Sequence, residues 1–427
     1  MNDNQRFETL ALHAGQPVDE TRSRAVPLYR TASYLFDSTE HASDLFALKK
    51  TGNIYNRIMN PTQDVLEKRL ATLEKAPASL ALASGTSAVF YTVLNICRSG
   101  DEIVSSKHLY GGTYTMFADI LPSLGINTKF VDFKDTESIE KAITNKTKIL
   151  YCEMIGNPTL EVADLQNLSA IAKKHHLPLV IDSTFATPYL CQPLEHGADI
   201  VIHSLTKWLG GHGTGIGGAV VDGGKFDWTD PKFSLYNEPD TGYHGLRFAH
   251  DLGENNNLAF ILRLRLVPLR NLGACISPDN AWMFLQGIET LALRMERHCE
   301  NAIKVAEYLI KHKKVAWVRY PGLVTDSAHK TASKYLKQGF GGMVVFGIKG
   351  GIKEGACFIN NLQLFSHVAN VGDAKSLAIH PSSTTHSQLS EQEQLSGGIT
   401  PQLIRLSIGI EHIDDILFDL EQAFSKV

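Results

Sequence analysis

The sequence lacks the features that mark secreted, membrane-bound and nucleic-acid-binding proteins. Its six cysteines include no CxxC pair, which argues against a disulfide framework and against structural zinc. No apolar run approaches the roughly 18 residues that a membrane span requires, and residues 1–16 contain no apolar core like that of a secretory signal. A net charge of -4 gives no electrostatic reason to expect nucleic acid or an anionic membrane as a partner. We therefore expect a cytoplasmic protein.

Neither of two common nucleotide-binding motifs predicts a nucleotide site in this sequence. The phosphate-binding loop GxxxxGK[ST] does not occur. The spacing GxGxxG does occur, at Gly213, Gly215 and Gly218, but it does not lie between a first strand and its helix. We therefore do not predict a dinucleotide site, and no metal site is expected.

What is present is an alternation of short apolar runs with helix-compatible segments, beginning near residue 62. With 43% hydrophobic and 20% charged residues, the 427-residue chain is typical of a globular protein of two or three domains. Strands interleaved with crossover helices predict an α/β fold, a mostly parallel sheet with helices on both faces. The predicted strands are 79–83, 102–105, 128–133, 148–152, 179–182 and 199–202, and helices are predicted over 62–75, 86–97 and 164–175.

The parts outside this alternation define the predicted domains. Residues 1–61 lack periodicity, but their aromatic side chains favour an arm that orders against another surface over a disordered tail. Residues 222–277 are irregular, and we interpret them as an insertion or a set of loops beside the site. A long helix is predicted over 279–312, and strands at 342–348 and 403–408 follow it. We predict an N-terminal arm (1–61), a large domain (62–290, with the insertion) and a smaller α/β C-terminal domain (291–427).

Lys207 is the first candidate for chemistry. It follows an apolar run that ends at Ile202, and the glycine-rich stretch 210–218 comes after it. A lysine in an apolar pocket has its charged form disfavoured, so its free amine becomes accessible near neutral pH and can bond covalently to a carbonyl cofactor. The alternative is a surface lysine ahead of a flexible loop, and this segment alone does not decide between the two.

Two segments could hold a phosphate group on such a cofactor. Gly85 and Thr86 fall between a strand and its helix, where a glycine lets the backbone approach an anion and the first helical amides point at it. A plain helix N-cap is the alternative. Ser204 and Thr206 share one face of an extended segment, and they supply the second element that an anion site needs.

Three more residues suit a cofactor with a flat ring. Asp182 ends a buried-type strand, where its carboxylate can keep a ring nitrogen protonated, although it could instead cap the next turn. Asn157 precedes Pro158 after a strand, and it could hydrogen-bond a ring hydroxyl or simply mark a turn. Tyr110 precedes two glycines, and it could stack on the ring or be an ordinary packed tyrosine. Together these elements describe a pyridoxal phosphate (PLP) site.

The ordered set of motifs resembles the Cys/Met-metabolism family of PLP enzymes, and within it the O-acetylhomoserine sulfhydrylase branch. The resemblance runs nearly end to end. No single motif decides it, but the set in this order is specific. The segments that carry it are 9–15 (TLALHAG), 55–57 (YNR), 84–88 (SGTSA), 109–113 (LYGGT), 156–158 (GNP), 182–184 (DST), 204–207 (SLTK), 371–377 (VGDAKSL) and 404–409 (IRLSIG).

The resemblance implies an aminotransferase-like fold (PLP fold type I) and a role for each candidate residue. Lys207 would carry PLP covalently and move protons, with Tyr110 as a second catalytic residue that stacks on the ring. The family also forms homotetramers built from two tight dimers, and Tyr55 and Arg57 would reach the PLP phosphate of a neighbouring subunit. Within its own subunit the phosphate would be bound by Gly85, Thr86, Ser204 and Thr206, the pyridine nitrogen by Asp182, the ring hydroxyl by Asn157, and the substrate carboxylate by Arg405 with Ser376.

The expected reaction is γ-replacement, in which O-acetyl-L-homoserine and sulfide give L-homocysteine and acetate, a step of methionine biosynthesis. Residues 208–214 and the long 222–277 segment resemble the sulfhydrylase branch. Gly112 stands where methionine γ-lyases usually have cysteine, which argues against that activity, whereas Gly215 replaces a serine usual in sulfhydrylases. Cystathionine γ-synthase, O-succinylhomoserine sulfhydrylase and methionine γ-lyase are the alternatives, and a non-catalytic sulfur-relay partner is a more distant one.

Overall fold

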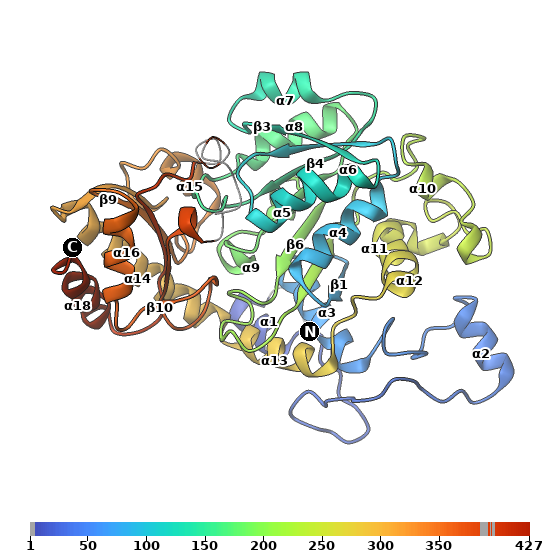
Figure 1. Ribbon diagram of the computed structural model, residues 1–427. Helices are drawn as coiled ribbons and strands as arrows, with labels where there is room; N and C mark the ends of the chain where they lie inside the picture. Colours follow the sequence, from blue (N-terminus) through green and yellow to red (C-terminus); the bar gives the residue numbers. More distant parts are fainter. Residues whose placement is uncertain (1–4, 385–391, 393, 395–397) are drawn as a thin grey trace.

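Two β-sheets organise the chain in the computed structural model, which describes residues 5–384, 392, 394 and 398–427 (Figure 1). The larger sheet has seven strands in the order β1-β7-β6-β5-β4-β2-β3. Only β7 runs antiparallel to its neighbours, so this sheet is mostly parallel, as predicted. Its strands are β1 (Ala78–Leu82), β2 (Glu102–Ser106), β3 (Asn127–Val131), β4 (Thr147–Glu153), β5 (Leu179–Asp182), β6 (Ile200–Ser204) and β7 (Gly218–Asp222).

The six predicted strands of this sheet correspond to β1–β6, with ends that differ by a few residues. The sequence patterns did not predict β7, because it begins in the glycine-rich stretch and ends where the insertion was placed. Gly218 is required at its start, since a Cβ there would lie 2.1 Å from the carbonyl oxygen of Ser84. The glycine therefore serves close backbone packing in a strand rather than a flexible loop.

Helices cover both faces of the larger sheet (Figure 1). Successive residues of a strand face opposite sides, so Val180 and Ile181 of β5 belong to two different apolar clusters. One cluster includes α3 (Pro61–Leu73) and α8 (Leu165–Lys174), and the other includes α4 (Gly85–Ile96) and α11 (Ala259–Leu264). Shorter helices in the same part of the chain are α5 (Gly111–Thr115), α6 (Leu121–Ser123), α7 (Thr136–Ala142) and α9 (Thr187–Leu190).

Residues 222–277 do not form a set of loops beside the site, which was one of the two interpretations of this segment. They contain α10 (Ser234–Asn237), α11 and α12 (Arg270–Leu272), and none of them lines the cavity that holds Lys207. Trp228 stacks on Tyr236 and on Phe260, with ring centroids 4.3 and 5.5 Å apart. All three rings are buried in the cluster that includes α4. The irregular sequence therefore builds part of the core.

The single helix predicted over 279–312 is wrong, because the structure has two helices, α13 (Pro278–Glu289) and α14 (Leu291–Lys311). Thr290 separates them with φ −109° and ψ 12°. The carbonyl of Gly287 accepts a hydrogen bond from the Arg294 guanidinium at 2.6 Å. A Cβ at Gly287 would lie 2.3 Å from the carbonyl oxygen of Gly210, so another segment presses on the helix at this point. The apolar periodicity continues across the break and could not reveal it.

The smaller sheet lies in the C-terminal part of the chain, in the order β10-β11-β12-β9-β8. Its strands β9 and β12 are the two predicted for this region, and Phe346, Phe358 and Phe424 pack together in its core. Residues 385–391, 393 and 395–397 of the predicted C-terminal domain lie outside the described residues. The elements are β8 (Val315–Arg319), α15 (His329–Tyr335), β9 (Met343–Ile348), α16 (Ile352–Asn361), β10 (Ser366–His367), β11 (Leu377–Ile379), β12 (Leu403–Ser407) and α18 (Ile413–Phe424).

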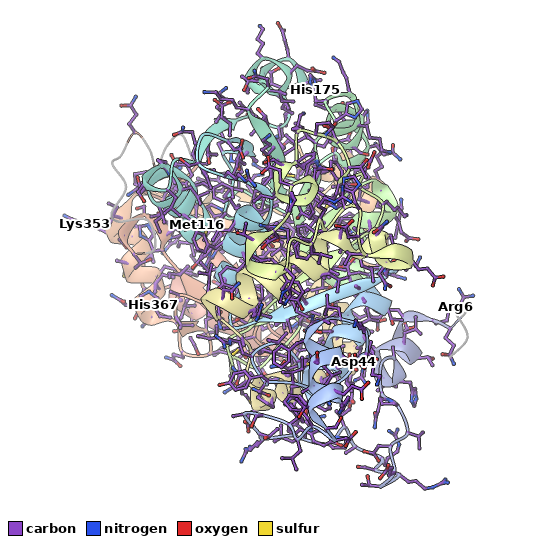
Figure 2. All side chains as sticks on the ribbon, turned by 90° about the vertical axis from the view of Figure 1, so that its right-hand side faces the viewer. Arg6, Asp44, Met116, His175, Lys353 and His367 are labelled. Carbon is purple, nitrogen blue, oxygen red and sulfur yellow. The ribbon has the colours of Figure 1, made fainter. Side chains whose placement is uncertain are left out.

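The first sixty residues include α1 (Phe7–His13), which packs against α3, and α2 (Thr39–Phe46), which lies away from the body of the molecule (Figure 1); residues 1–4 lie outside the described ones. Figure 2 shows His175 near the top of the molecule, Asp44 in its lower half and Arg6 at its right-hand edge. Leu35 is 99% exposed, and aromatic rings of the same segment are partly exposed. Such a segment presents apolar surface that fits an arm. Within the described parts of the chain, no helix has the length and apolar character of a membrane span.

Candidate active site

A cavity of about 560 Å³ opens at the carboxyl ends of the parallel strands. This edge is where ligands bind in open α/β sheets. Most of the predicted site residues line it, although they come from distant parts of the sequence. These residues are Gly85, Thr86, Tyr110, Asn157, Asp182, Ser204, Thr206, Lys207 and Arg405.

Lys207 lies just beyond β6 with its amine inside this cavity. Burial, with a smaller contribution from the nearby Arg405 cation, lowers the pKa of Lys207 to about 8. Its Nζ donates a hydrogen bond to Oδ1 of Asn370 at 2.6 Å. A substantial fraction of the amine is therefore neutral near physiological pH, which a covalent bond to a carbonyl group requires.

The two predicted phosphate-binding segments converge on one wall of the cavity. Gly85 and Thr86 are the first residues of α4, where amide N–H groups have no acceptor within the helix. The N-cap alternative also holds, because Ser84 Oγ accepts a hydrogen bond from the backbone N–H of Ser87 at 3.0 Å. A Cβ at Gly85 would lie 2.7 Å from Cβ of Ser204, so only glycine lets the helix start approach Ser204 this closely. The second anion-binding element therefore stands beside the first.

Asp182 ends β5 and lines the cavity, and its Oδ1 accepts a hydrogen bond from the backbone N–H of Thr184 at 2.9 Å. Asp182 therefore caps the following turn, as the alternative proposed, and it also lines the cavity, as the functional interpretation requires. Burial raises the pKa of the Asp182 carboxyl group. A cation placed against Asp182 would favour its negative charge and oppose this rise.

Arg405 projects from β12 into the same cavity, where it is buried. Its Nη1 donates a hydrogen bond to Oδ1 of Asn157 at 2.9 Å. Burial lowers the pKa of Arg405 to about 10, so its guanidinium is still a cation at neutral pH. No carboxylate of the described residues contributes to the pKa of Arg405, and burial of a charge without a partner of opposite charge is costly. An anionic group of a ligand would complete this pairing.

Ser376 is not brought to the cavity, contrary to its predicted contact with a substrate carboxylate. It is fully buried, and its Oγ donates a hydrogen bond to Oε2 of Glu411 at 2.9 Å and accepts one from the backbone N–H of Gly409. Its hydroxyl is therefore engaged in holding two chain segments together. Asn370 takes the place beside Lys207 instead, and it was missed because it lies one residue before the motif that was matched.

Tyr55 and Arg57 lie outside this cavity, in the arm. The Arg57 guanidinium sits 5.4 Å from the centroid of the Tyr55 ring, and Tyr55 is 42% exposed. The Nε of Arg57 is buried without a hydrogen-bond partner among the described residues. Within a single subunit these two residues therefore have no part in the site around Lys207.

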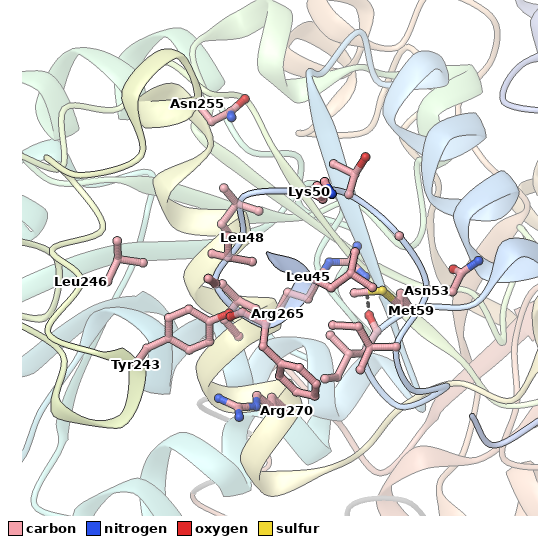
Figure 3. A pocket seen from close by; sticks show the side chains of 18 of the residues that line it. Leu45, Leu48, Lys50, Asn53, Met59, Tyr243, Leu246, Asn255, Arg265 and Arg270 are labelled. Carbon is pink, nitrogen blue, oxygen red and sulfur yellow. Dashed lines mark hydrogen bonds between the residues drawn. The ribbon is translucent and has the colours of Figure 1, made fainter. Parts of the chain in front are cut away.

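A larger cavity of about 900 Å³ lies between the arm and residues 243–270 (Figure 3). Figure 3 shows Leu45, Leu48 and Met59 on one side of it and Tyr243 on the other. Lys50 is the single lysine of the described residues that line it, and it pairs with Asp44 at 3.0 Å. None of the predicted cofactor residues lines this cavity. Although it is larger than the cavity around Lys207, it is therefore not the candidate active site.

Comparison with known proteins agrees with the geometry around Lys207. Residues 8–425 match the family of Cys/Met metabolism PLP-dependent enzymes. The chain belongs to this family. It is 56% identical to O-acetyl-L-homoserine sulfhydrylase of Leptospira meyeri over 100% of this chain and 98% of that protein, and 50% identical to homocysteine synthase of Schizosaccharomyces pombe over 99% and 98%. A proposed O-acetylhomoserine (thiol)-lyase of Campylobacter jejuni, solved with N'-pyridoxyl-lysine-5'-monophosphate, superposes with a TM-score of 0.95 at 41% identity over 99% of this chain and 100% of that one.

Family membership confirms the predicted fold class and the PLP cofactor. The fold is that of PLP fold type I proteins, a mostly parallel sheet with helices on both faces and a second, smaller sheet. The residues of the cavity fit PLP on chemical grounds. They combine a partly buried amine in Lys207 with a lowered pKa, helix amides at Gly85 for a phosphate, and the acid Asp182 at a place where a protonated ring nitrogen would be stabilised.

Replacing Lys207 with alanine is expected to abolish the yellow absorbance of covalently bound PLP, because no other lysine among the described residues lines the cavity. Absorption spectra before and after borohydride treatment measure this. The matched control is Lys107→Ala, whose ammonium pairs with Asp132 at 3.1 Å outside the cavity, and which should keep the band. A yellow Lys207→Ala protein that borohydride bleaches would contradict the assignment.

The rate at which the apoenzyme bonds PLP is expected to rise with pH and to level off above about 8, because the neutral amine of Lys207 is the nucleophile. Below that pH the neutral fraction, and with it the rate, should rise about tenfold per pH unit. In Arg405→Met the midpoint should move to higher pH, since a neighbouring positive charge is removed. Stopped-flow absorbance at a series of pH values measures the profile, and a rate independent of pH in this range would disprove the explanation.

Proposed function

We propose that this protein catalyses γ-replacement, in which O-acetyl-L-homoserine and sulfide give L-homocysteine and acetate. The observation that carries the proposal is the presence of a partly buried amine and a buried cation in one cavity, Lys207 for chemistry and Arg405 for an amino-acid carboxylate. The names of the full-length relatives from Leptospira meyeri and Schizosaccharomyces pombe support the choice of reaction.

The substrate carboxylate is held by Arg405, whose planar guanidinium donates two parallel hydrogen bonds to such a group. Asn157 orients Arg405 through the 2.9 Å hydrogen bond between their side chains. Asn370 is placed close to the substrate by its bond to Lys207 and its position in the cavity wall. The carboxylate compensates the buried charge of Arg405, so binding relieves a desolvation cost as well as positioning the substrate.

PLP, when bound, supplies the electron sink that stabilises negative charge at the carbon atoms of the substrate. The residues proposed to hold it are Gly85, Thr86, Ser204 and Thr206 at the phosphate, with Asp182 at the pyridine nitrogen, Asn157 at the ring hydroxyl and Tyr110 on the ring face. Lys207, released when the substrate amine takes its place, accepts the proton from Cα. A Cβ proton is then lost, acetate leaves Cγ, sulfide adds at Cγ, and protons return to Cβ and Cα. A pKa of about 8 suits an amine that has to act as base and as acid.

Gly112 favours the sulfhydrylase reaction over γ-elimination by a methionine γ-lyase, in which this position usually holds cysteine. A Cβ at Gly112 would lie 2.6 Å from Cε1 of Tyr110. Any side chain here would therefore displace the Tyr110 ring from the place it occupies at the cavity. Tyr110 is 52% exposed, so part of its side chain is accessible to a ligand.

We also propose a homotetramer built as a dimer of dimers, in which Tyr55 and Arg57 contact the PLP phosphate of a neighbouring subunit. The support is their position in the arm, away from the cavity of their own subunit, and the unpartnered buried Nε of Arg57. Exposed apolar side chains along the arm, such as Leu35 and Phe36, would be buried by a second subunit.

Incubation with O-acetyl-L-homoserine and sulfide is expected to give homocysteine and acetate in equal amounts. Arg405→Lys should raise KM for the amino-acid substrate by about tenfold or more, because lysine lacks the planar fork that binds a carboxylate. Parallel assays with O-succinylhomoserine, cysteine and methionine distinguish the alternative reactions. A yellow, folded protein that forms no homocysteine from the acetyl ester would overturn the proposed activity.

Mixing two inactive variants tests the shared site. Arg57→Ala and Lys207→Ala should each have little activity alone. If Arg57 acts in a neighbouring site, mixed dimers contain one intact site, so unfolding the two proteins together and refolding them should restore about a quarter of the sites. PLP-dependent activity of the refolded mixture measures this. No recovery in mixtures whose mixed dimers are verified by mass spectrometry would argue that Arg57 acts within its own subunit.

A further inference from the structure

Glu153 bridges two walls of the active-site cavity. It is the last residue of β4, is 8% exposed, and lines the cavity, but its sequence context gave no reason to select it. Its Oε1 accepts a hydrogen bond from the backbone N–H of Tyr110 at 2.5 Å. Its Oε2 accepts one from the backbone N–H of Asn157 at 3.1 Å. One carboxyl group therefore ties the segment that leads into α5 to the segment that follows β4.

The two tied segments carry different functions in the proposed site. Tyr110 presents its ring to the place assigned to PLP, and Asn157 accepts a hydrogen bond from Arg405, the assigned carboxylate binder. Glu153 thus contacts Tyr110 directly, and it is connected to Arg405 through Asn157. Both segments therefore depend on the position of one carboxyl group.

Stability alone does not explain an acid at this position, because burial there disfavours a carboxylate. Burial raises the pKa of Glu153 well above its usual value, and Asp182 raises it further, since the two residues are paired in register on β4 and β5. The two N–H bonds oppose this rise. A carboxyl group is the side chain that offers two acceptor oxygens to two divergent donors, whereas glutamine offers one acceptor and an NH2 group that faces the other donor.

We propose that Glu153 is a positioning residue that fixes Tyr110 and Asn157 together, so that the ring-contacting and carboxylate-binding sides of the active site keep their spacing. The inference rests on the roles given above to Tyr110, Asn157 and Arg405. It adds that the distance between these two subsites is set by one buried side chain that touches neither the ring nor the substrate carboxylate.

Glu153→Gln tests this inference with little change of shape. We expect kcat/KM to fall by about tenfold or more, with a rise in KM for the amino-acid substrate, because a buried hydrogen bond to the Tyr110 or the Asn157 amide is lost. The circular dichroism of bound PLP should also change, since it reports how the ring is held. Glu153→Asp keeps both oxygens on a shorter side chain, and should retain more activity than Glu153→Gln. If the glutamine variant does not fold, the aspartate variant is compared with wild type by the same measurements.

Glu161→Gln is the matched control. Glu161 lies on the same connection after β4, and its carboxylate pairs with Arg319 at 3.0 Å outside the cavity. This variant should keep the kinetic constants and the cofactor signal of the wild type. It also shows how much a lost ion pair nearby alters thermal unfolding without touching the site.

A double-variant comparison separates positioning from general stability. If Glu153 acts through Asn157, the loss caused by Glu153→Gln should be smaller in an Asn157→Ala background than in the wild type. Losses that simply multiply, or a lower unfolding temperature with unchanged KM and unchanged circular dichroism, would overturn the inference. The circular dichroism and PLP affinity are measured without substrate, so they test Glu153 even if the enzyme proves to act on a different ester.

Discussion

Burial of charged groups at one edge of the parallel sheet is the constraint on which the rest of this structure depends. Arg405 and Glu153 are buried, and Lys207 and Asp182 are partly buried beside them. Burial disfavours the charged form of each group, which is why the pKa of the lysine falls to about 8 and the pKa values of the two acids rise. A phosphate, a protonated ring nitrogen and a substrate carboxylate would supply the opposite charges. The cavity is therefore electrostatically incomplete without its cofactor and substrate.

The topology explains how groups so far apart in sequence share this edge. The carboxyl ends of neighbouring parallel strands lie side by side, which brings Glu153 and Asp182 into register. The smaller sheet adds Arg405 from β12, and Asn370 from the segment before β11. A backbone hydrogen bond of 2.8 Å from Ala374 to Gly211 joins that segment to the glycine-rich stretch after Lys207. Residues from both sheets therefore form the site. Gly211, in the stretch that resembled a flexible loop, makes a contact between them.

The sequence was informative where local patterns determine structure and uninformative where distant backbone contacts do. Buried parallel strands are apolar runs, so the strands and the residues at their ends, such as Asp182, could be predicted. The strand that starts at Gly218 lies against the backbone of Ser84, and the helix that ends at Thr290 lies against the backbone of Gly210. Both contacts come from distant parts of the sequence, so no local pattern reveals them. A matched motif likewise gives the order of residues and not the direction in which each side chain points. For this reason Ser376 was assigned to a cavity that Asn370 lines.

Residues that local patterns miss, such as Glu153, contact other groups of the site, and one such residue lies outside the cavity. His203 is next to Ser204 on β6 but faces the other side of the sheet, where its Nε2 lies 2.6 Å from Oε1 of Glu74, with both side chains fully buried. Burial raises the pKa of Asp182, hydrogen bonds from Thr184 lower it, and His203 lowers it further. His203 thus acts on the Asp182 carboxyl group from behind the sheet, but burial outweighs it and the pKa of Asp182 stays raised. The surroundings of the Asp182 carboxyl group therefore include a side chain on the far face of the sheet as well as those that line the cavity.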